Sequence, residues 1–297
     1  MMRTFLFLAT NVAVLVVISL VFNLLGLTGV NAAGGLDLTS LLVMSAIIGF
    51  TGSLISLFLS KSMAKRGMGV QVIEQPSTPF ERWLVDTVAR QSQVAGIRMP
   101  EVGIFDSPEP NAFATGWNRN AALVAVSTGL LQTMTKDEVA AVVGHEISHV
   151  ANGDMVTLTL IQGVVNTFVV FLSRIIGSVV DQALRGSNDQ RSGPGIGSFI
   201  ATMVAQVLLS FLATMIVMWF SRYREFHADA GGARLTSRRQ MADALRALQR
   251  GHATTDLPAQ EFAAFGISGG MGQGLQALFM SHPPLEVRIA ALESGRD

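Results

Sequence analysis

The chain has 297 residues, of which 49% are hydrophobic and only 14% charged, and its formal net charge is zero. Because a typical soluble domain carries about 25% charged residues, this length and composition suit either two domains or one domain joined to membrane spans. The balanced charge provides no basic field, so we expect no nucleic-acid partner. The absence of cysteine excludes disulfides, a thiol nucleophile and cysteine-ligated zinc.

The first sixty residues contain two uncharged stretches. Phe5 to Leu25 is the apolar part of the first, and Leu38 to Ser60 is the second. Each is long enough to cross a bilayer, which takes about 20 residues. A cleaved signal peptide is the alternative for the first stretch, but the apolar run of this stretch exceeds the roughly 7–15 residues of the apolar h-region in a signal peptide. We therefore expect a transmembrane hairpin over residues 1–60.

Basic residues flank this hairpin and set its orientation. Arg3 precedes the first stretch, and Lys61, Lys65 and Arg66 follow the second, whereas the loop between them has no Lys or Arg. Positively charged residues stay on the cytoplasmic side of a membrane. Both ends of the hairpin are therefore expected in the cytoplasm, together with the chain that follows Lys61.

Residues 61–153 have a globular composition. The expected elements are a short strand at Val70–Ile73, a helix from Pro79 to about Gly96, and strands at Glu101–Phe105, Asn111–Trp117 and Ala121–Ser127. This pattern indicates an α+β arrangement. An edge strand can hold an extended peptide by main-chain hydrogen bonds, so the candidate substrate contacts are Asn111, Ala112, Phe113 and Ala114. An interior strand that touches no ligand is the alternative.

The segment His145-Glu146-Ile147-Ser148-His149 has the pattern H-E-x-x-H. On a helix, residues four apart lie on one face, so both histidines can bind one metal ion. Zinc suits imidazole nitrogens and in catalytic sites leaves one position open for water. Glu146 is then placed to act as the general base that takes a proton from the attacking water. The alternative is a chance spacing on an ordinary core helix.

The helix that would carry this pattern has its own start and stop signals. Thr135 stands three residues before Glu138, which is the spacing of a capping box. Asn152-Gly153 is a typical helix end. Apolar residues between these limits predict that one face is buried.

A second pair of uncharged stretches follows, Met155 to Ser173 and Ile196 to Ser221, with a polar segment from Asp181 to Gly195 between them. Both can span a membrane, so we expect a second hairpin over residues 154–221. Arg174 lies near the outer end of the third stretch, where a long side chain can reach the interface. If the hairpin were instead buried in protein, Arg174 would need a carboxylate partner.

Glu225 and Asp229 follow the fourth stretch and share one helix face by their spacing. Two histidines and one glutamate form a known catalytic zinc set, so Glu225 is the candidate third ligand. Asp229 can accept the free N–H of a liganding histidine. A salt bridge from Glu225 to Arg222 or Arg224 is the alternative, and His227 competes as third ligand.

The remaining chain supplies few signals. Ser237 to Arg250 has the pattern of an amphipathic helix, and Gly266 to Gly274 is a glycine-rich loop. A last helix is expected from His282-Pro283-Pro284 to about Glu293. Tyr223, the only tyrosine, is a candidate hydrogen-bond donor to the reacting group.

Together these blocks resemble the HtpX-type membrane zinc proteases, which are related to the CAAX prenyl endopeptidases. The matching blocks are Asn111-Ala112-Phe113-Ala114, His145-Glu146-Ile147-Ser148-His149, Ser221 to Asp229, and Ser281-His282-Pro283-Pro284. The resemblance covers nearly the whole chain. It implies a gluzincin-like α+β metalloprotease domain combined with α-helical transmembrane spans, in two hairpins and four spans. It also implies Glu225 as third zinc ligand, Asp229 as the partner of a liganding histidine, and His282 as a hydrogen-bond donor to the oxyanion.

The resemblance further implies an integral membrane endopeptidase that uses Zn²⁺ and cuts misfolded or damaged membrane proteins, as part of quality control and the stress response. Its catalytic domain would combine residues 61–153 and 222–297 on the cytoplasmic side of a bacterial inner membrane. The expected partners are polypeptide substrates and the lipid bilayer, and assembly with further copies of the chain stays open. Two alternatives stay open: a narrow-specificity processing protease of the CAAX prenyl type, and a non-enzymatic membrane scaffold that contains zinc.

Overall fold

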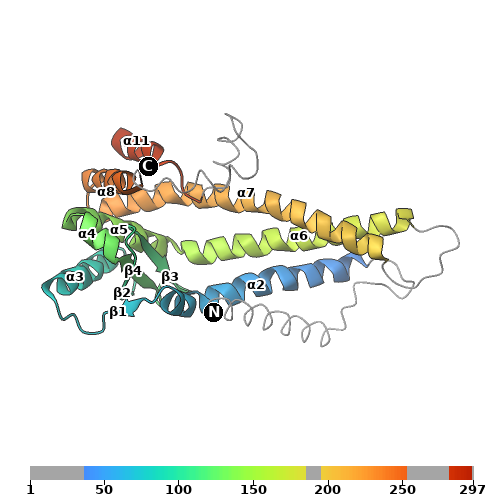
Figure 1. The fold of residues 1–297 in the computed structure, drawn as a ribbon, viewed down its shortest axis with the longest axis horizontal. Helices are drawn as coiled ribbons and strands as arrows, with labels where there is room; N and C mark the ends of the chain where they lie inside the picture. Colours follow the sequence, from blue (N-terminus) through green and yellow to red (C-terminus); the bar gives the residue numbers. More distant parts are fainter. Residues whose placement is uncertain (1–36, 185–194, 253–280, 296–297) are drawn as a thin grey trace. The chain divides into compact units, whose positions relative to one another are not determined.

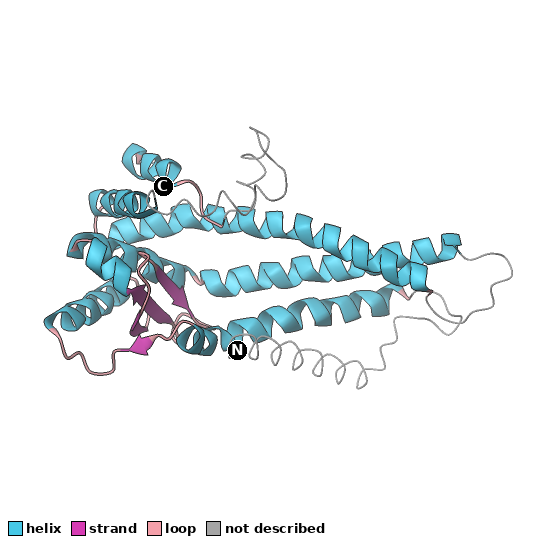
Figure 2. Ribbon diagram, in the orientation of Figure 1, coloured by secondary structure: helices cyan, strands magenta, loops and turns pink. Residues whose placement is uncertain are grey.

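The computed structural model describes residues 37–184, 195–252 and 281–295 (Figure 1). These residues form long helices and one small sheet (Figure 2). The expected first span, Phe5 to Leu25, and the glycine-rich loop Gly266 to Gly274 lie outside the described residues. The chain divides into two compact units. Within the described residues, one holds the helical segments up to Ser56 and from Leu158 to Val217, and the other holds Leu57–Thr157 and the chain from Met218 onward.

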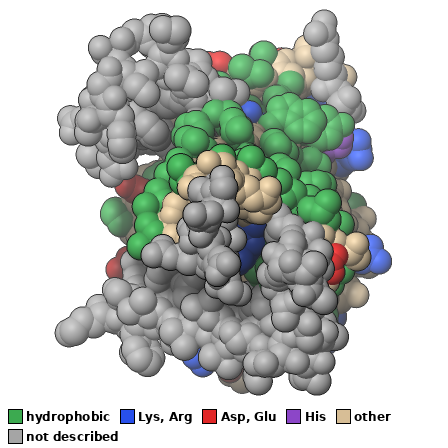
Figure 3. All heavy atoms as spheres, turned by 90° about the vertical axis from the view of Figure 1, so that its right-hand side faces the viewer, with side chains coloured by type: hydrophobic (Ala, Val, Ile, Leu, Met, Phe, Trp, Pro, Cys, Tyr) green, Lys and Arg blue, Asp and Glu red, His purple; other side chains and the backbone are tan. Residues whose placement is uncertain are grey.

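The first unit consists of parts of three helices that are long and apolar enough to cross a membrane. They are α2 (Leu38–Gly67), α6 (Asp154–Leu184) and α7 (Ile196–Leu235). Many of their large apolar side chains are exposed, as expected of lipid-facing surfaces, and Figure 3 shows hydrophobic side chains over much of the described surface on its face. Three of the four expected spans are therefore helices, and the remaining one is the undescribed first stretch.

Two of these helices continue well beyond the uncharged stretches that predict them. α6 runs through Arg174 to Leu184, and Arg174 is exposed on it. α7 continues past Ser221 as one unbroken helix to Leu235. The segment with Glu225 and Asp229 is therefore the direct continuation of a candidate membrane span.

The sheet of the second unit has four strands in the order β1-β2-β4-β3. Their bounds are Gln71–Val72, Glu101–Phe105, Ala112–Thr115 and Leu123–Ser127 for β1, β2, β3 and β4. β2 and β4 are parallel, and the other two pairings are antiparallel. β4 is buried along its whole length, whereas β3 pairs with β4 alone among the described strands and forms an edge. The sheet is therefore mixed.

Helices pack on both sides of α5 (Lys136–Asn152), which lies at the centre of this unit. α5 contacts β3, β4, α3 (Pro79–Val94) and α8 (Arg238–His252), and α8 contacts α11 (Leu285–Ser294). The buried face of α5 includes Val139, Val143 and Ile147. A short helix, α4 (Thr128–Thr133), joins β4 to α5 and is not predicted by the sequence pattern.

Both ends of α5 match the chemistry of the sequence. The Thr135 hydroxyl accepts a hydrogen bond from the backbone N–H of Glu138, and the Glu138 carboxylate accepts one from the N–H of Thr135. Gly153 ends the helix in the left-handed conformation, with φ of 71°, which glycine adopts without a steric penalty. α6 begins at the next residue, Asp154, so the chain turns sharply beside the last turn of α5.

Candidate metal centre

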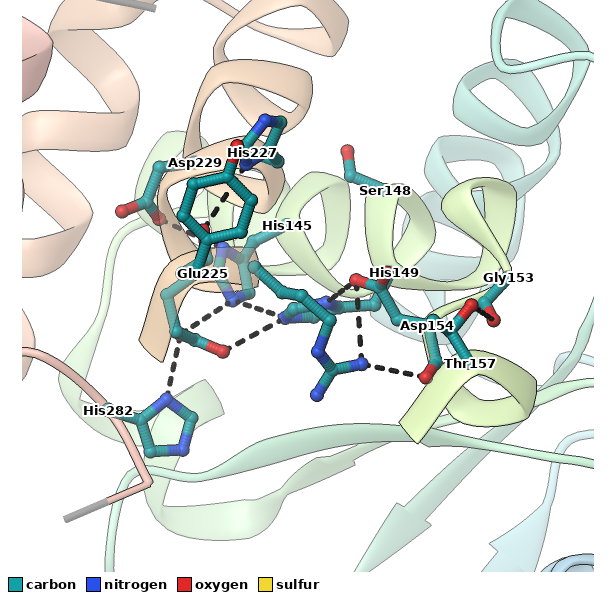
Figure 4. Close-up of polar contacts among 12 residues, drawn as sticks. His145, Ser148, His149, Gly153, Asp154, Thr157, Glu225, His227, Asp229 and His282 are labelled. Carbon is teal, nitrogen blue, oxygen red and sulfur yellow. Dashed lines mark hydrogen bonds and ion pairs between the residues drawn. The ribbon is translucent and has the colours of Figure 1, made fainter. Parts of the chain in front are cut away.

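α5 presents His145 and His149 on one face, and their Nε2 atoms lie 3.1 Å apart (Figure 4). The Nδ1 atom of each ring contacts a carboxylate. His145 Nδ1 is 2.9 Å from Asp229 Oδ1, and His149 Nδ1 is 2.6 Å from Asp154 Oδ2. These contacts fix the orientation of both rings and direct both Nε2 atoms to a common point.

α7 brings the third side chain to that point. The carboxylate oxygens of Glu225 lie 3.5 Å from His145 Nε2 and 3.3 Å from His149 Nε2. One ligand atom from each of the three residues lies within 4.8 Å of the other two. Only 3% of the Glu225 side chain is exposed, so this carboxylate is removed from water. The three side chains proposed as ligands from the sequence therefore meet in one place.

A close approach of α5 and α7 makes this convergence possible. A Cβ atom added at Gly232 would lie 2.9 Å from the backbone nitrogen of His145, and one added at Gly231 would lie 2.5 Å from Ser148 Oγ. Real Cβ atoms essentially never come that near. The absence of side chains at these two positions lets the helix with Glu225 and Asp229 lie directly against the helix with the histidines.

The geometry of the three ligands fits a tetrahedral zinc ion. Ligand atoms placed about 2.0–2.1 Å from such an ion stand about 3.3 Å from one another. The separations here are 3.1, 3.5 and 3.3 Å. Because each Nδ1 donates its proton to a carboxylate, each Nε2 directs a lone pair at the other ring. Only an added proton or a metal cation can lie between them.

The charge of the site also favours a cation. Burial lowers the pKa of His149, but the hydrogen bonds to Asp154 and Glu225 and the negative charge of Glu146 outweigh it and raise the pKa to about 10. Burial likewise lowers the pKa of His145, and the hydrogen bonds to Asp229 and Glu225 raise it above its usual value. Without a metal His149 retains an added proton, because the surrounding carboxylates stabilise positive charge there.

Two arginines complete the site behind the carboxylates. Arg288 of α11 donates from Nε and Nη2 to both Asp229 oxygens, at 2.7 and 2.6 Å, and its Nη1 lies 3.1 Å from Glu225 Oε2. Arg224 Nη1 donates to the backbone oxygen of Asp154 at 2.8 Å. Four carboxylates thus face two guanidinium groups, so with neutral histidines a divalent ion balances the charge. The carboxylates are those of Glu146, Asp154, Glu225 and Asp229.

Asp154 and Arg288 belong to this site although the sequence pattern does not single them out. Asp154 lies five residues beyond His149, past the glycine that ends α5, and Arg288 lies in the final helix. The signal for Asp154 is an acidic residue directly after a helix-ending glycine. The alternative in which Arg224 pairs with Glu225 is corrected, because Arg224 Nη1 lies 3.8 Å from Asp154 Oδ2 and pairs with that carboxylate instead.

The remaining candidate residues are His282, Tyr223, His227 and Glu146. His282 Nδ1 is 2.7 Å from Glu225 Oε2, and 59% of its side chain is exposed. Tyr223 is exposed, with its ring centroid 4.8 Å from that of His227. His227 lies outside the ligand group of the described residues, which disfavours it as third ligand. Glu146 follows His145 on α5 and is partly exposed.

Comparison with known proteins agrees with this geometry. The model of peptidase family M48 matches residues 80–296. The chain is 59% identical over 296 residues to protease HtpX of Thioalkalivibrio sulfidiphilus, covering 99% of each chain. It is 59% identical over 297 residues to protease HtpX of Pseudoalteromonas atlantica, covering 99% of this chain and 100% of the relative.

A crystal structure of S. mikatae Ste24p has the same fold, with a TM-score of 0.68 and 18% identity. That alignment covers 98% of this chain and 64% of Ste24p, so the chain spans less than two thirds of that protein. The HtpX relatives match from end to end, and their shared family supplies the reaction class. The chain therefore belongs to the HtpX proteases of peptidase family M48 and is a membrane metalloprotease.

Proposed function

We propose that this protein is a zinc endopeptidase that hydrolyses peptide bonds of misfolded or damaged membrane proteins. The observation that carries the proposal is the convergence of two histidines and one buried glutamate, each supported by a charged neighbour. A zinc ion held by His145, His149 and Glu225 would polarise the scissile carbonyl and lower the pKa of water. The family membership favours this enzyme over a non-enzymatic scaffold.

Glu146 acts in this proposal as the general base. It follows His145 directly on α5 and is partly exposed, so its carboxylate can reach a water molecule beside the ligands. It accepts a proton from the attacking water and passes it to the leaving amine. The negative charge of Glu146 already acts on His149, whose pKa it helps to raise, which supports its place beside the ligands.

His282 and Tyr223 are the proposed donors to the oxyanion that forms at the carbonyl oxygen. His282 Nδ1 contacts Glu225, and 59% of the His282 side chain is exposed. Tyr223 is on α7, half a turn before Glu225, with an exposed ring. A fixed donor of this kind typically lowers the barrier by about 2.7–4 kcal/mol.

The edge strand β3 is the proposed substrate platform. Its outer edge is free of partners among the described strands, and its residues Ala112, Phe113 and Ala114 are partly exposed, with Asn111 exposed just before them. Main-chain hydrogen bonds from such an edge hold peptides of many sequences. This suits a protease that recognises the unfolded state rather than one motif.

The proposed location is the bacterial inner membrane, with the unit that contains the metal ligands in the cytoplasm. This rests on the basic residues at the ends of α2 and of the apolar part of α7, which include Lys61, Lys65 and Arg222. The catalytic domain would then be built from residues 61–153 and 222–297. The compact unit formed by Leu57–Thr157 and the chain from Met218 supports this boundary.

The test is Glu146→Gln in the full-length, detergent-purified protein, assayed on an unfolded membrane protein with zinc present. Hydrolysis should fall by about 10²- to 10⁴-fold while one zinc stays bound per chain. Asp137→Asn, an exposed change on the same helix, is the control and should leave activity unaltered. Undiminished hydrolysis by the Gln variant would rule out this role. A single cut in a lipidated peptide, with indifference to unfolded proteins, would favour the CAAX-type alternative.

A further inference from the structure

The metal ligands lie very close to the ends of two apolar stretches. On α7 the uncharged stretch ends at Ser221, four residues before Glu225, which is about 6 Å along the helix axis. On α6 the apolar stretch begins at Met155, directly after Asp154, which contacts His149. Because a bilayer ends where such stretches end, both helices place the ligands at the level of the lipid headgroups.

A third element of the same unit also marks this level. Phe58 lies near the end of the uncharged stretch of α2, and its ring centroid is 5.9 Å from that of Trp117, which follows β3. Both side chains are turned outward, with 57% of Phe58 and 48% of Trp117 exposed. Tryptophan concentrates where the apolar core of a bilayer meets its headgroups, since the ring is apolar and the N–H can bond to water.

The turn that carries Trp117 is held in one shape. We call residues 116–120, between β3 and β4, the interfacial tip. Gly116 has φ of 148°, and a Cβ there would lie 2.9 Å from Ala121 O, so a side chain does not fit. Asn118 Oδ1 accepts from the Asn120 N–H at 2.7 Å, and Asn118 O accepts from the Ala121 N–H at 3.2 Å. Trp117 is therefore presented by an ordered turn.

Basic side chains of α2 contact residues beside the interfacial tip. Lys61 donates to Ala121 O at 3.3 Å and pairs with Glu101 at 2.9 Å, and Lys65 also pairs with Glu101. Arg119 at the tip is exposed. An exposed tryptophan with basic neighbours matches the apolar boundary and the phosphate groups of a lipid surface.

We propose that the interfacial tip is seated in the headgroup layer, so that the Thr115 end of strand β3 lies at the membrane and β3 takes substrate segments that emerge directly from the bilayer. β3 ends at Thr115, next to the tip, and its four residues extend about 13 Å. The substrate class is thus the juxtamembrane segment of a membrane protein. This part rests on the proposed role of β3 as the peptide platform, whereas the seating of the tip does not.

The seating is tested by the depth of the tryptophans, of which the chain has three. A Trp83→Phe/Trp219→Phe protein, which retains Trp117, is reconstituted in phosphatidylcholine vesicles brominated at shallow or deep acyl positions. We expect its fluorescence to be quenched, and more strongly by the shallow bromines. The control retains only Trp83, on α3 beneath the Lys136 ammonium, and should stay unquenched.

This measurement needs no enzymatic activity, so its result is independent of the proposed reaction. The proposal would be overturned if bromine quenched Trp117 fluorescence no more than Trp83 fluorescence. That result is expected if a second copy of the chain or a soluble partner covers the interfacial tip. The substrate class is tested with a single-span protein that carries one cleavable segment about 5 or about 25 residues from the bilayer. We expect the near segment to be cut at least as fast as the far segment. Cleavage of the far segment alone would refute the proposed substrate class.

Discussion

Replacing Asp154 by alanine should weaken zinc binding without unfolding the protein. Asp154 Oδ2 accepts the Nδ1 proton of His149 at 2.6 Å, and only 10% of the aspartate side chain is exposed. Loss of the carboxylate frees the ring to rotate and to place its proton on Nε2, the atom needed by the metal. Arg224 holds the backbone oxygen of residue 154, so the start of α6 should remain in place.

The expected size follows from the nature of this contact. Removing the partner of a liganding histidine typically lowers metal affinity by about 10- to 100-fold, or about 1.4–2.7 kcal/mol. Asp154→Asn keeps an oxygen that can accept the same proton, so it should lose less than about tenfold. The alanine change also removes an acidic residue from the first turn of a helix, which by itself costs about 0.3–1 kcal/mol of stability.

The assay is competition for zinc between the purified protein and a fluorescent chelator. Asp137→Ala is the matched control because it removes an exposed acid from the first turn of α5, far from the ligands. The wild type and Asp137→Ala should bind equally, followed by Asp154→Asn and then Asp154→Ala. Equal zinc affinity of the wild type and Asp154→Ala would refute the reasoning that this carboxylate orients His149.

Three further outcomes are expected. The pKa of His149 in the metal-free protein is about 10, so zinc must displace a proton when it binds between pH 6 and 8. Zinc affinity should therefore rise about tenfold per pH unit over this range. Calorimetry that shows no proton release on zinc binding would contradict this expectation. Arg288→Met removes the guanidinium partner of the buried Asp229 carboxylate and should cost about 3–5 kcal/mol in denaturant unfolding, whereas Arg239→Met, at a 92% exposed side chain, should cost almost nothing. Gly232→Ala should separate α5 from α7, cost about 1–3 kcal/mol and weaken zinc binding; unchanged zinc affinity would argue against the helix contact.

Local chemistry accounts for the elements that the sequence predicts well. The capping box at Thr135 and the glycine at 153 both act within a few residues, so the limits of α5 follow directly from the sequence. The strands are short apolar runs between turn residues, and all four begin and end within two residues of expectation. α4 is missed because six residues give too little periodicity to distinguish a helix from a turn.

In the metal site, too, some features follow from local sequence and others depend on tertiary contacts. The spacing of His145 and His149, and of Glu225 and Asp229, is local and predicts which side chains share a face. That Asp154 orients His149 depends on the sharp turn at Gly153, and that Arg288 reaches Asp229 depends on how α11 packs on α8. The Arg288 contact cannot be deduced from neighbours in the sequence, since 59 residues separate Arg288 from Asp229.

Because α7 is unbroken, one continuous helix contains both a candidate membrane span and the metal ligand Glu225. Glu225 lies about three turns inside the helix end at Leu235, and on its other side the preceding turn of α7 includes Ser221, whose carbonyl is four residues back. A fragment trimmed at Arg222 to gain solubility would leave Glu225 in a frayed first turn. A protein shortened to its water-facing half would therefore lose the metal ion that the reaction needs.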